Sequence, residues 1–534
     1  MKKHNILKVV LLSILVAIVC TWVFPTASYQ TELVVGERSQ LGIFDLFSYT
    51  VELFRYFPYV ILMTLAAGIF YGVAYKISAY RVLLDKIVKM FSGKESIFLA
   101  IAMILIAAIV SVTGLSFGIL FVFPFIISLV LLMGYNKLVA ASVTVGSTIV
   151  GILGTTLGSS TVYYFNAVLG TDIQNEMITK VILLVVGLVL LVFNVLLYAK
   201  KTRNSTDKVL EFVPVSISAD KKDVKVVKEE KVKVAKKETK KSAAKKSDSK
   251  KKAEVEKKTT KKSSAKKATT KTKAYDLKSK TAEVLTVKSK KKAKVWPFIL
   301  VFDLVVILIA VASFDWSIFE VKVFEDALTA VQEFEIGGFP IFAKILGSVS
   351  PFGNWTLNYE VPALIILATS FLGFIYGLKL DDFLDGVVEG IKRALKPTIY
   401  MFLIYLVLVI CTYNPFQLNI TKFFLDLTKD LNVITMTLIA MISSIFNVES
   451  VYVAQSTLPY VSSVITDATL YPLLAVIFQA VYGLMMLVAP TSVILIGTLS
   501  YLEVPYGQWL KHIWKLFLEL LVVLVVIFFV VFLI

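Results

Sequence analysis

Two long apolar blocks, residues 5–199 and 296–534, constrain the fold of this chain more than any other feature. Hydrophobic residues make up 57% of its 534 positions. Several apolar runs reach roughly 20 residues, the length that an α-helix needs to cross the hydrocarbon core of a bilayer. Such a helix satisfies its own backbone groups within lipid. The sequence therefore predicts an all-α polytopic membrane protein.

One local pattern occurs in both blocks. Gly68-Ile-Phe-Tyr-Gly72 closes an apolar run and precedes an amphipathic segment, and Gly373-Phe-Ile-Tyr-Gly377 does the same in the second block. A duplicated apolar unit with a polar hinge is common in secondary transporters, which bind substrate between their halves. We therefore predict two related helical halves with broken helices or re-entrant hairpins, residues 1–203 and 296–534, either inverted or parallel.

The stretch between the blocks carries the basic charge of the chain. Residues 220–294 contain 30 Lys and 10 acidic residues, so their net charge of +20 exceeds the formal +18 of the whole chain. Such a composition cannot bury a core, and we expect a disordered linker over residues 204–295. Two roles stay open for it: a solvated linker attracted to anionic lipid, or a segment that binds RNA, ribosomes or DNA by charge.

Basic residues also indicate the orientation. Lys2 and Lys3 precede the first apolar run, which we interpret as an uncleaved membrane helix over residues 5–24 rather than a signal peptide. The positive-inside rule then places the N-terminus and the 204–295 loop in the cytoplasm. Following the chain from there gives roughly ten to twelve spans, which we expect in the inner (plasma) membrane of a bacterium.

Few residues offer metal or covalent chemistry. Cys20 and Cys411 lie in apolar runs, and His4 and His512 lie at opposite ends of the chain. These positions provide no disulfide framework and no metal-ligand spacing. No nucleotide-binding loop occurs in the sequence either. We therefore predict no enzyme activity, no metal site and no cofactor, with Na⁺ or H⁺ as the candidate coupling ion.

Four segments interrupt the apolar runs with small and polar residues, at 113–118, 154–161, 447–455 and 490–492. Irregular backbone is costly in lipid, so it occurs where it faces protein, water or substrate. Exposed N–H groups at a half-helix start favour a carboxylate, whereas carbonyls and hydroxyls favour a small cation. The alternative is that small residues only let helices pack closely. The candidate substrate or ion ligands are Thr113, Gly114, Ser116, Gly118, Thr155, Thr156, Ser159, Ser160, Thr161, Asn447, Glu449, Ser450, Pro490, Thr491 and Ser492.

Glu449 differs from the other candidates because it is ionisable. It lies between apolar runs, beside Asn447 and Ser450, in blocks with few charges. Carboxylates within a membrane often couple transport to an ion or proton. The alternative is that Glu449 lies at a helix end that is in contact with water.

Two stretches carry a resemblance to a known family. Ala489-Pro490-Thr491-Ser492-Val493, with Val504-Pro505-Tyr506-Gly507-Gln508-Trp509, resembles the C-terminal signature of the YfcC-like carriers. Thr113-Gly114-Leu115-Ser116-Phe117-Gly118 is similar to their first-half glycine turn. These carriers are grouped with anaerobic C4-dicarboxylate carriers and arginine/ornithine-type antiporters. The resemblance covers both apolar blocks but not the lysine-rich stretch, and it implies an ion-coupled or exchanging carrier.

The sequence thus predicts a secondary active transporter of a small carboxylate-bearing metabolite, an amino acid or a dicarboxylate. Its expected partners are that substrate, membrane lipid, and an anionic lipid or RNA for the lysine-rich loop, with a homodimer left open. The alternative is a membrane-anchored tether whose loop binds RNA, ribosomes, DNA or anionic lipid.

Overall fold

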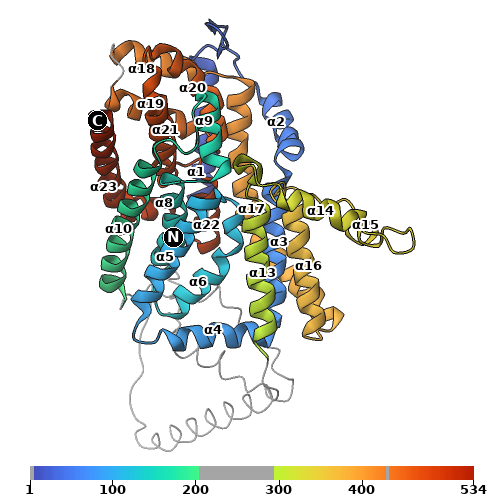
Figure 1. The fold of residues 1–534 in the computed structure, drawn as a ribbon. Helices are drawn as coiled ribbons and strands as arrows, with labels where there is room; N and C mark the ends of the chain where they lie inside the picture. The colour runs from blue at the N-terminus through green and yellow to red at the C-terminus, as the bar shows by residue number, and fades with distance from the viewer. Residues whose placement is uncertain (1–4, 204–293, 429–431, 534) are drawn as a thin grey trace, which may run out of the picture. The chain divides into compact units, whose positions relative to one another are not determined.

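The computed structural model describes residues 5–203, 294–428 and 432–533 (Figure 1). Nearly all of the described elements are helices, most of them α-helices, as expected for an all-α polytopic protein. Within the described residues, seven helices are long and apolar enough to span a membrane. Several further apolar helices have 10–17 residues, and most of these lie next to a break in the chain. Those breaks explain why counting apolar runs predicted more spans than there are long helices.

The first half, up to residue 203, opens on a helix and a small hairpin. Strands β1 (Ala27–Tyr29) and β2 (Leu33–Val35) pair antiparallel, with Ser28 opposite Val34. The helices of this half are α1 (Asn5–Val23), α2 (Ile43–Tyr56), α3 (Pro58–Lys76), α4 (Ser78–Met90), α5 (Glu95–Thr113), η1 (Gly118–Phe121), α6 (Phe123–Leu132), α7 (Lys137–Ala141), η2 (Ser142–Gly146), α8 (Ser147–Leu153), η3 (Ser159–Tyr163), α9 (Tyr164–Leu169) and α10 (Met177–Thr202).

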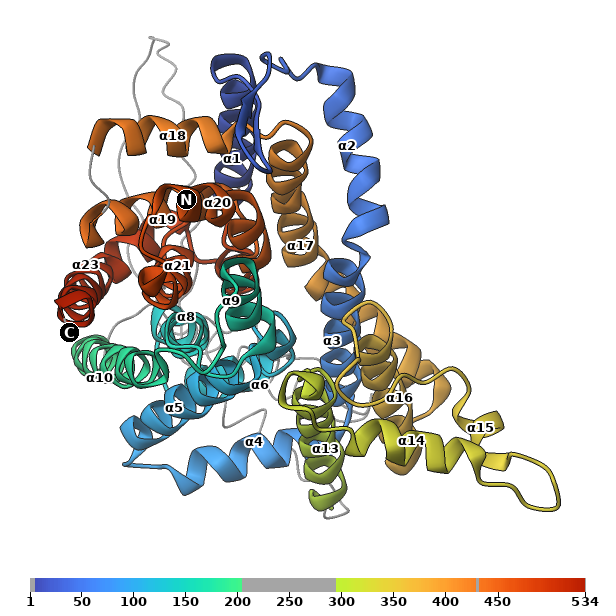
Figure 2. The same ribbon diagram turned by 45° about the horizontal axis from the view of Figure 1, so that its top comes forward.

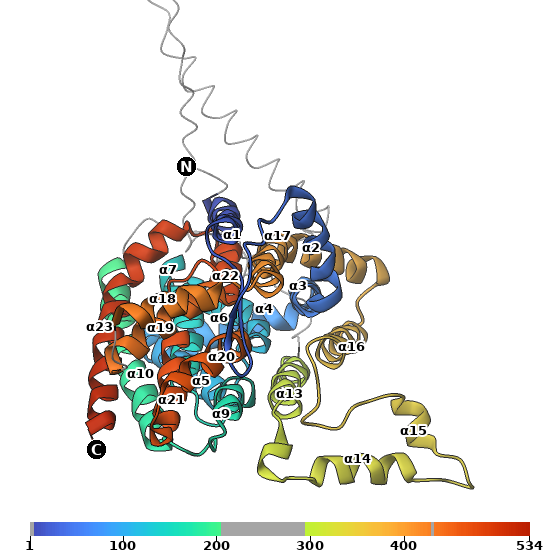
Figure 3. The same ribbon diagram turned by 90° about the horizontal axis from the view of Figure 1, so that it is seen from above.

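The second half begins at residue 294. Its helices are α13 (Trp296–Ala312), η5 (Trp316–Phe319), α14 (Val323–Glu333), α15 (Ile341–Leu346), α16 (Glu360–Ile375), α17 (Leu380–Tyr413), α18 (Gln417–Thr428), α19 (Val433–Phe446), α20 (Ser450–Val464), η6 (Ala468–Leu470), α21 (Tyr471–Met486), α22 (Val493–Leu502) and α23 (Tyr506–Leu533). Helices α14 and α15 bury no residue and extend away from the other helices (Figure 3).

The same order of elements occurs twice. A long helix (α3, α17) leads to a short amphipathic helix (α4, α18), then to a helical hairpin (α5–α6, α19–α20), a broken helix (α7–α9, α21–α22) and a final long helix (α10, α23). The packing repeats as well, because α5 lies against α8 as α19 lies against α21. The two amphipathic helices lie at opposite ends of the helical unit (Figure 1). This arrangement is that of inverted repeats.

The final helices of the two repeats, α10 and α23, pack side by side (Figure 2). The first helices of the two repeats, α3 and α17, also pack against each other. The two repeats therefore contact each other through corresponding elements. The broken helices lie between these pairs, because α8 packs against α21.

The Gly68–Gly72 pattern does not mark the repeat and is not a hinge, contrary to the sequence-based prediction. Helix α3 runs through it without a break and crosses α17 there. A Cβ on Gly68 would lie 2.6 Å from the Cβ of Ala394, and one on Gly72 would overlap the backbone of Gly386. The pattern serves close helix packing. Its second copy has another role, because Gly377 follows α16 with a φ of +59°.

Candidate functional site

The four polar segments of the sequence correspond to four interruptions of the helices. Helix α5 ends at Gly114, which has a φ of +71°. Helix α8 ends at Leu153, and the chain becomes helical again at Ser159, where the π-helix η3 begins. The other two breaks, at 447–449 and 487–492, separate α19 from α20 and α21 from α22. The break at 447–455 is shorter than predicted, because residues 450–455 already belong to α20.

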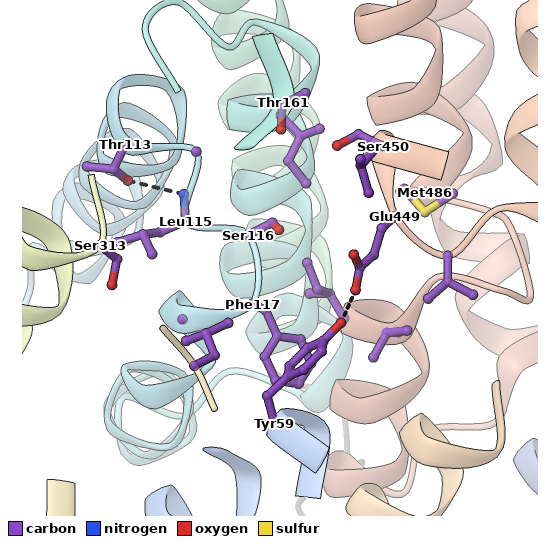
Figure 4. Close-up of a pocket in the computed structure, with 18 of the residues that line it drawn as sticks. Tyr59, Thr113, Leu115, Ser116, Phe117, Thr161, Ser313, Glu449, Ser450 and Met486 are labelled. Carbon is purple, nitrogen blue, oxygen red and sulfur yellow. Dashed lines mark hydrogen bonds between the residues drawn. The ribbon is translucent and has the colours of Figure 1, made fainter. Parts of the chain in front are cut away.

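These four breaks meet around one cavity of about 370 Å³ (Figure 4). Both repeats contribute to its wall, together with the end of α13 and the segment before α16. The predicted candidates that line it are Thr113, Gly114, Ser116, Gly118, Thr161, Glu449, Ser450 and Ser492. Residues more than 300 positions apart in the sequence therefore share one chamber.

Glu449 lies in the wall of this cavity, directly before α20, and two tyrosines hold it. The hydroxyls of Tyr59 on α3 and Tyr405 on α17 both donate to its Oε1 atom, the latter at 2.6 Å. The two hydroxyl oxygens lie 2.9 Å apart. One carboxylate oxygen is thus fixed by the first helix of each repeat. Glu449 therefore precedes a helix and also faces the cavity, and its role in coupling stays a prediction.

Two helices begin at the cavity. Ser450 and Val451, the first residues of α20, line it, and so do Val493 and Ile494, the first residues of α22. The first backbone N–H groups of a helix have no partner within the helix and point out of its start. They favour a negatively charged group there, through free donors and the helix dipole.

The remaining candidates whose side chains are described do not line the cavity, and most of them form hydrogen bonds within or beside the breaks. Thr155 donates to the Ile152 carbonyl at 2.7 Å, Asn447 to the Ser443 carbonyl at 2.9 Å, and Thr491 to the Ile445 carbonyl at 2.7 Å. Thr156 pairs with the Ser111 hydroxyl at 3.2 Å. Pro490 lies in the break before α22. The side chains of Ser159 and Ser160 lie outside the described part of the chain.

Sequence reasoning missed several cavity residues. Tyr59, Tyr405 and Tyr482 contribute hydroxyls near Glu449, and Tyr482 donates to the Val448 carbonyl at 2.9 Å. Ser313 and Asn358 come from the segments that flank α14 and α15. The tyrosines occur in apolar runs, where an aromatic residue looks like core. They can be identified only from the structure, in which they lie close to Glu449 although they are far from it in the sequence.

Comparison with known proteins agrees with this architecture. The family model of the C4-dicarboxylate anaerobic carriers (DcuC) matches residues 4–247 and 255–533. The chain belongs to this family. As a DcuC-family carrier with several apolar helices, it is a multi-pass membrane protein. The resemblance drawn from the proline and glycine signatures is confirmed at this level.

Comparisons with solved structures and with curated proteins do not narrow the assignment beyond the family. The solved structure of the YdaH transporter from Alcanivorax borkumensis is similar over 98% of this chain and 97% of its own, with 12% identity and a TM-score of 0.35. That likeness is too low to support an argument about this DcuC-family chain. No curated protein matches the chain.

Proposed function

We propose that this chain is a secondary active transporter of a small carboxylate-bearing metabolite, an amino acid or a dicarboxylate. The observation that carries the proposal is the single cavity where four backbone breaks from two inverted repeats meet. Broken helices at the interface of inverted repeats are where secondary transporters bind substrate and coupling ions. Alternating access then exposes such a cavity to one side of the membrane at a time.

The start of α22 supports a carboxylate as the bound group. Val493 and Ile494 place backbone N–H donors at the cavity wall, and the hydroxyl of Ser492 precedes them. The hydroxyls of Ser116 and Thr161 line the same chamber. Together they match the acceptor oxygens of a small carboxylate.

Exchange or a Na⁺ or H⁺ gradient would drive the transport. The sequence contains no nucleotide-binding loop, and Glu449, for which the sequence predicts a role in coupling or a place at a helix end, lines the cavity. We further propose the inner membrane of a bacterium as the location, with the N-terminus in the cytoplasm. The narrower YfcC label and a homodimer stay predictions.

Uptake into proteoliposomes tests the function. We expect accumulation or exchange of at least one radiolabelled amino acid or dicarboxylate, lost on substitution Ser492→Trp, which would fill the cavity. Val526→Trp is the matched control, because that side chain is 55% exposed on α23 and lies outside the cavity lining. Absence of uptake and exchange for every compound, in protein that retains a cooperative melting transition, would contradict the proposal.

The tether hypothesis depends on residues 204–295, of which 204–293 lie outside the described residues. Excising 220–294 separates the two functions. A transporter should retain uptake after this deletion, whereas a tether should lose its salt-sensitive binding of RNA or anionic lipid.

A further inference from the structure

The charged residues that line the cavity indicate which chemical class of substrate it can bind. Among the described residues that line it, Glu449 is the one charged side chain, and no Lys, Arg or His joins it. Nor does Glu449 form an ion pair with any described residue. A carboxylate in a low-dielectric site is costly without a positive partner. A group brought by the ligand would provide that partner.

The geometry of Glu449 leaves one oxygen for such a group. Tyr59 and Tyr405 both donate to Oε1, and no described residue donates to Oε2. Figure 4 shows the second carboxylate oxygen turned away from Tyr59. A carboxylate oxygen is an acceptor only, so its natural ligand is a donor, and a cationic donor makes the strongest bond.

Two more polar atoms of the cavity residues lack partners. The Oδ1 atom of Asn358 and the hydroxyl oxygen of Ser313 are buried and accept or donate no hydrogen bond within the described structure. Buried polar atoms without partners are uncommon in folded proteins. Both atoms are enclosed by protein, so Glu449 is the acceptor that the cavity offers to a ligand.

We propose that Glu449 binds the ammonium group of the substrate, so that the carrier transports an α-amino acid rather than a dicarboxylate without an amino group. This inference rests on the proposed transport function and narrows its substrate class. The start of α22 supplies the complementary site for the substrate carboxylate. An amino acid carries both groups, and so matches in charge a chamber that offers a helix start and a single acidic side chain.

An unsubstituted dicarboxylate fits the same chamber poorly. Its second carboxylate would have to share the start of α20 with Glu449, which directly precedes that helix and is also negative. Like charges at short range in a poorly solvated site repel strongly. The family description therefore names a substrate class for which the described lining of this chain offers no cation.

Pairs of compounds that differ mainly by the amino group test the proposal. Aspartate is compared with succinate, and alanine with lactate, by thermal stabilisation of the purified protein and by proteoliposome uptake. We expect the amino member of each pair to bind about tenfold or more tightly, the effect of one charge-assisted hydrogen bond. Equal or tighter binding of succinate and lactate would overturn the proposal and leave the transport function intact.

The variant Glu449→Gln tests the residue. Glutamine keeps the size and the acceptor oxygen for the tyrosines but removes the charge, so we expect the preference for the amino member to disappear. Glu519→Gln is the matched control, because Glu519 pairs with Lys515 and Asn194 and lies outside the cavity lining. A preference that survives in Glu449→Gln would overturn the assignment. If that variant does not fold, the wild-type comparison still decides the substrate class.

Two other outcomes are distinguishable. Succinate binding that needs Na⁺ or low pH, and that Glu449→Gln abolishes, would make Glu449 an ion site and overturn the proposal. Absence of binding and uptake for all four compounds overturns it too. If other carboxylates are also not transported, the proposed function fails with it.

Discussion

The hydroxyl of Tyr405 lies 2.6 Å from Oε1 of Glu449 and donates to it, which joins the C-terminal part of α17 to the start of α20. Helix α17 opens the second repeat, and α20 forms half of its hairpin. Tyr59 adds a second donor from α3. The acidic side chain in the cavity is thus positioned by the first long helix of each repeat.

Removing that donor should weaken substrate binding more than folding. In Tyr405→Phe, the carboxylate loses a hydrogen bond worth about 1.5–3 kcal/mol, since bonds to charged groups fall in that range. We expect the KM of uptake to rise about tenfold or more while the ring still packs in place. Tyr413→Phe on the same helix is the control, because Tyr413 is 49% exposed. Equal KM values for the two variants would argue against the positioning role.

The close crossing of α3 and α17 should not tolerate even a methyl group. A Cβ on Gly72 would overlap the backbone of Gly386 and lie 2.7 Å from the Cα of Gly390. We expect Gly72→Ala to lower the stability by about 1–3 kcal/mol, as overpacking does. The measurement is the melting temperature in detergent.

Gly507→Ala is the control for that substitution, because nothing lies within 4 Å of the added atom in α23. Alanine is the better helix former, so this variant should be neutral or slightly stabilised. An unchanged melting temperature in Gly72→Ala would show that the two helices separate more easily than the structure indicates.

The broken helix of the first repeat depends on a side chain from the second. The Gln479 amide on α21 donates to the Thr155 carbonyl at 2.7 Å, and the Gln479 side chain is fully buried. In Gln479→Leu this carbonyl loses its partner, which costs about 1–3 kcal/mol. We expect a lower melting temperature together with reduced uptake. A variant as stable as the wild type would mean that water replaces the amide, or that removal of the unpaired, buried Oε1 of Gln479 offsets the loss.

Thiol labelling should report the cavity directly. In a background without Cys20 and Cys411, Ser116→Cys places a thiol in the cavity wall, whereas Ser128→Cys places one away from it. We expect a small methanethiosulfonate reagent to modify the first faster, and a transported substrate to slow only that reaction. Equal rates for both positions, with no effect of substrate, would contradict an accessible chamber at Ser116.

Sequence reasoning located the polar breaks but not how they assemble. Proline, glycine and clustered hydroxyls mark places where a helix cannot continue, so Gly114, Glu449 and Ser492 were predicted to lie at interruptions, and they do. The convergence of these breaks depends on inverted packing, which hydropathy does not encode. The binding role of the residues stays a prediction.

Some local patterns pointed to the wrong role. The two Gly-x-x-Tyr-Gly stretches look alike, yet one lies within a helix crossing and the other ends a helix. Tyr59 and Tyr405 have ordinary apolar neighbours in the sequence, so only their hydrogen bonds to Glu449 distinguish them from core residues. A short sequence pattern specifies a local backbone preference, whereas its structural role depends on the tertiary contacts around it.

The bond between Gln479 and Thr155 also bears on how the protein is made. Its two residues are 324 positions apart, so the donor is synthesised long after the carbonyl has left the ribosome. Until α21 is made, the Thr155 carbonyl after α8 lacks this partner. A chain that stops before α21 therefore cannot complete the break of the first repeat in the form described here.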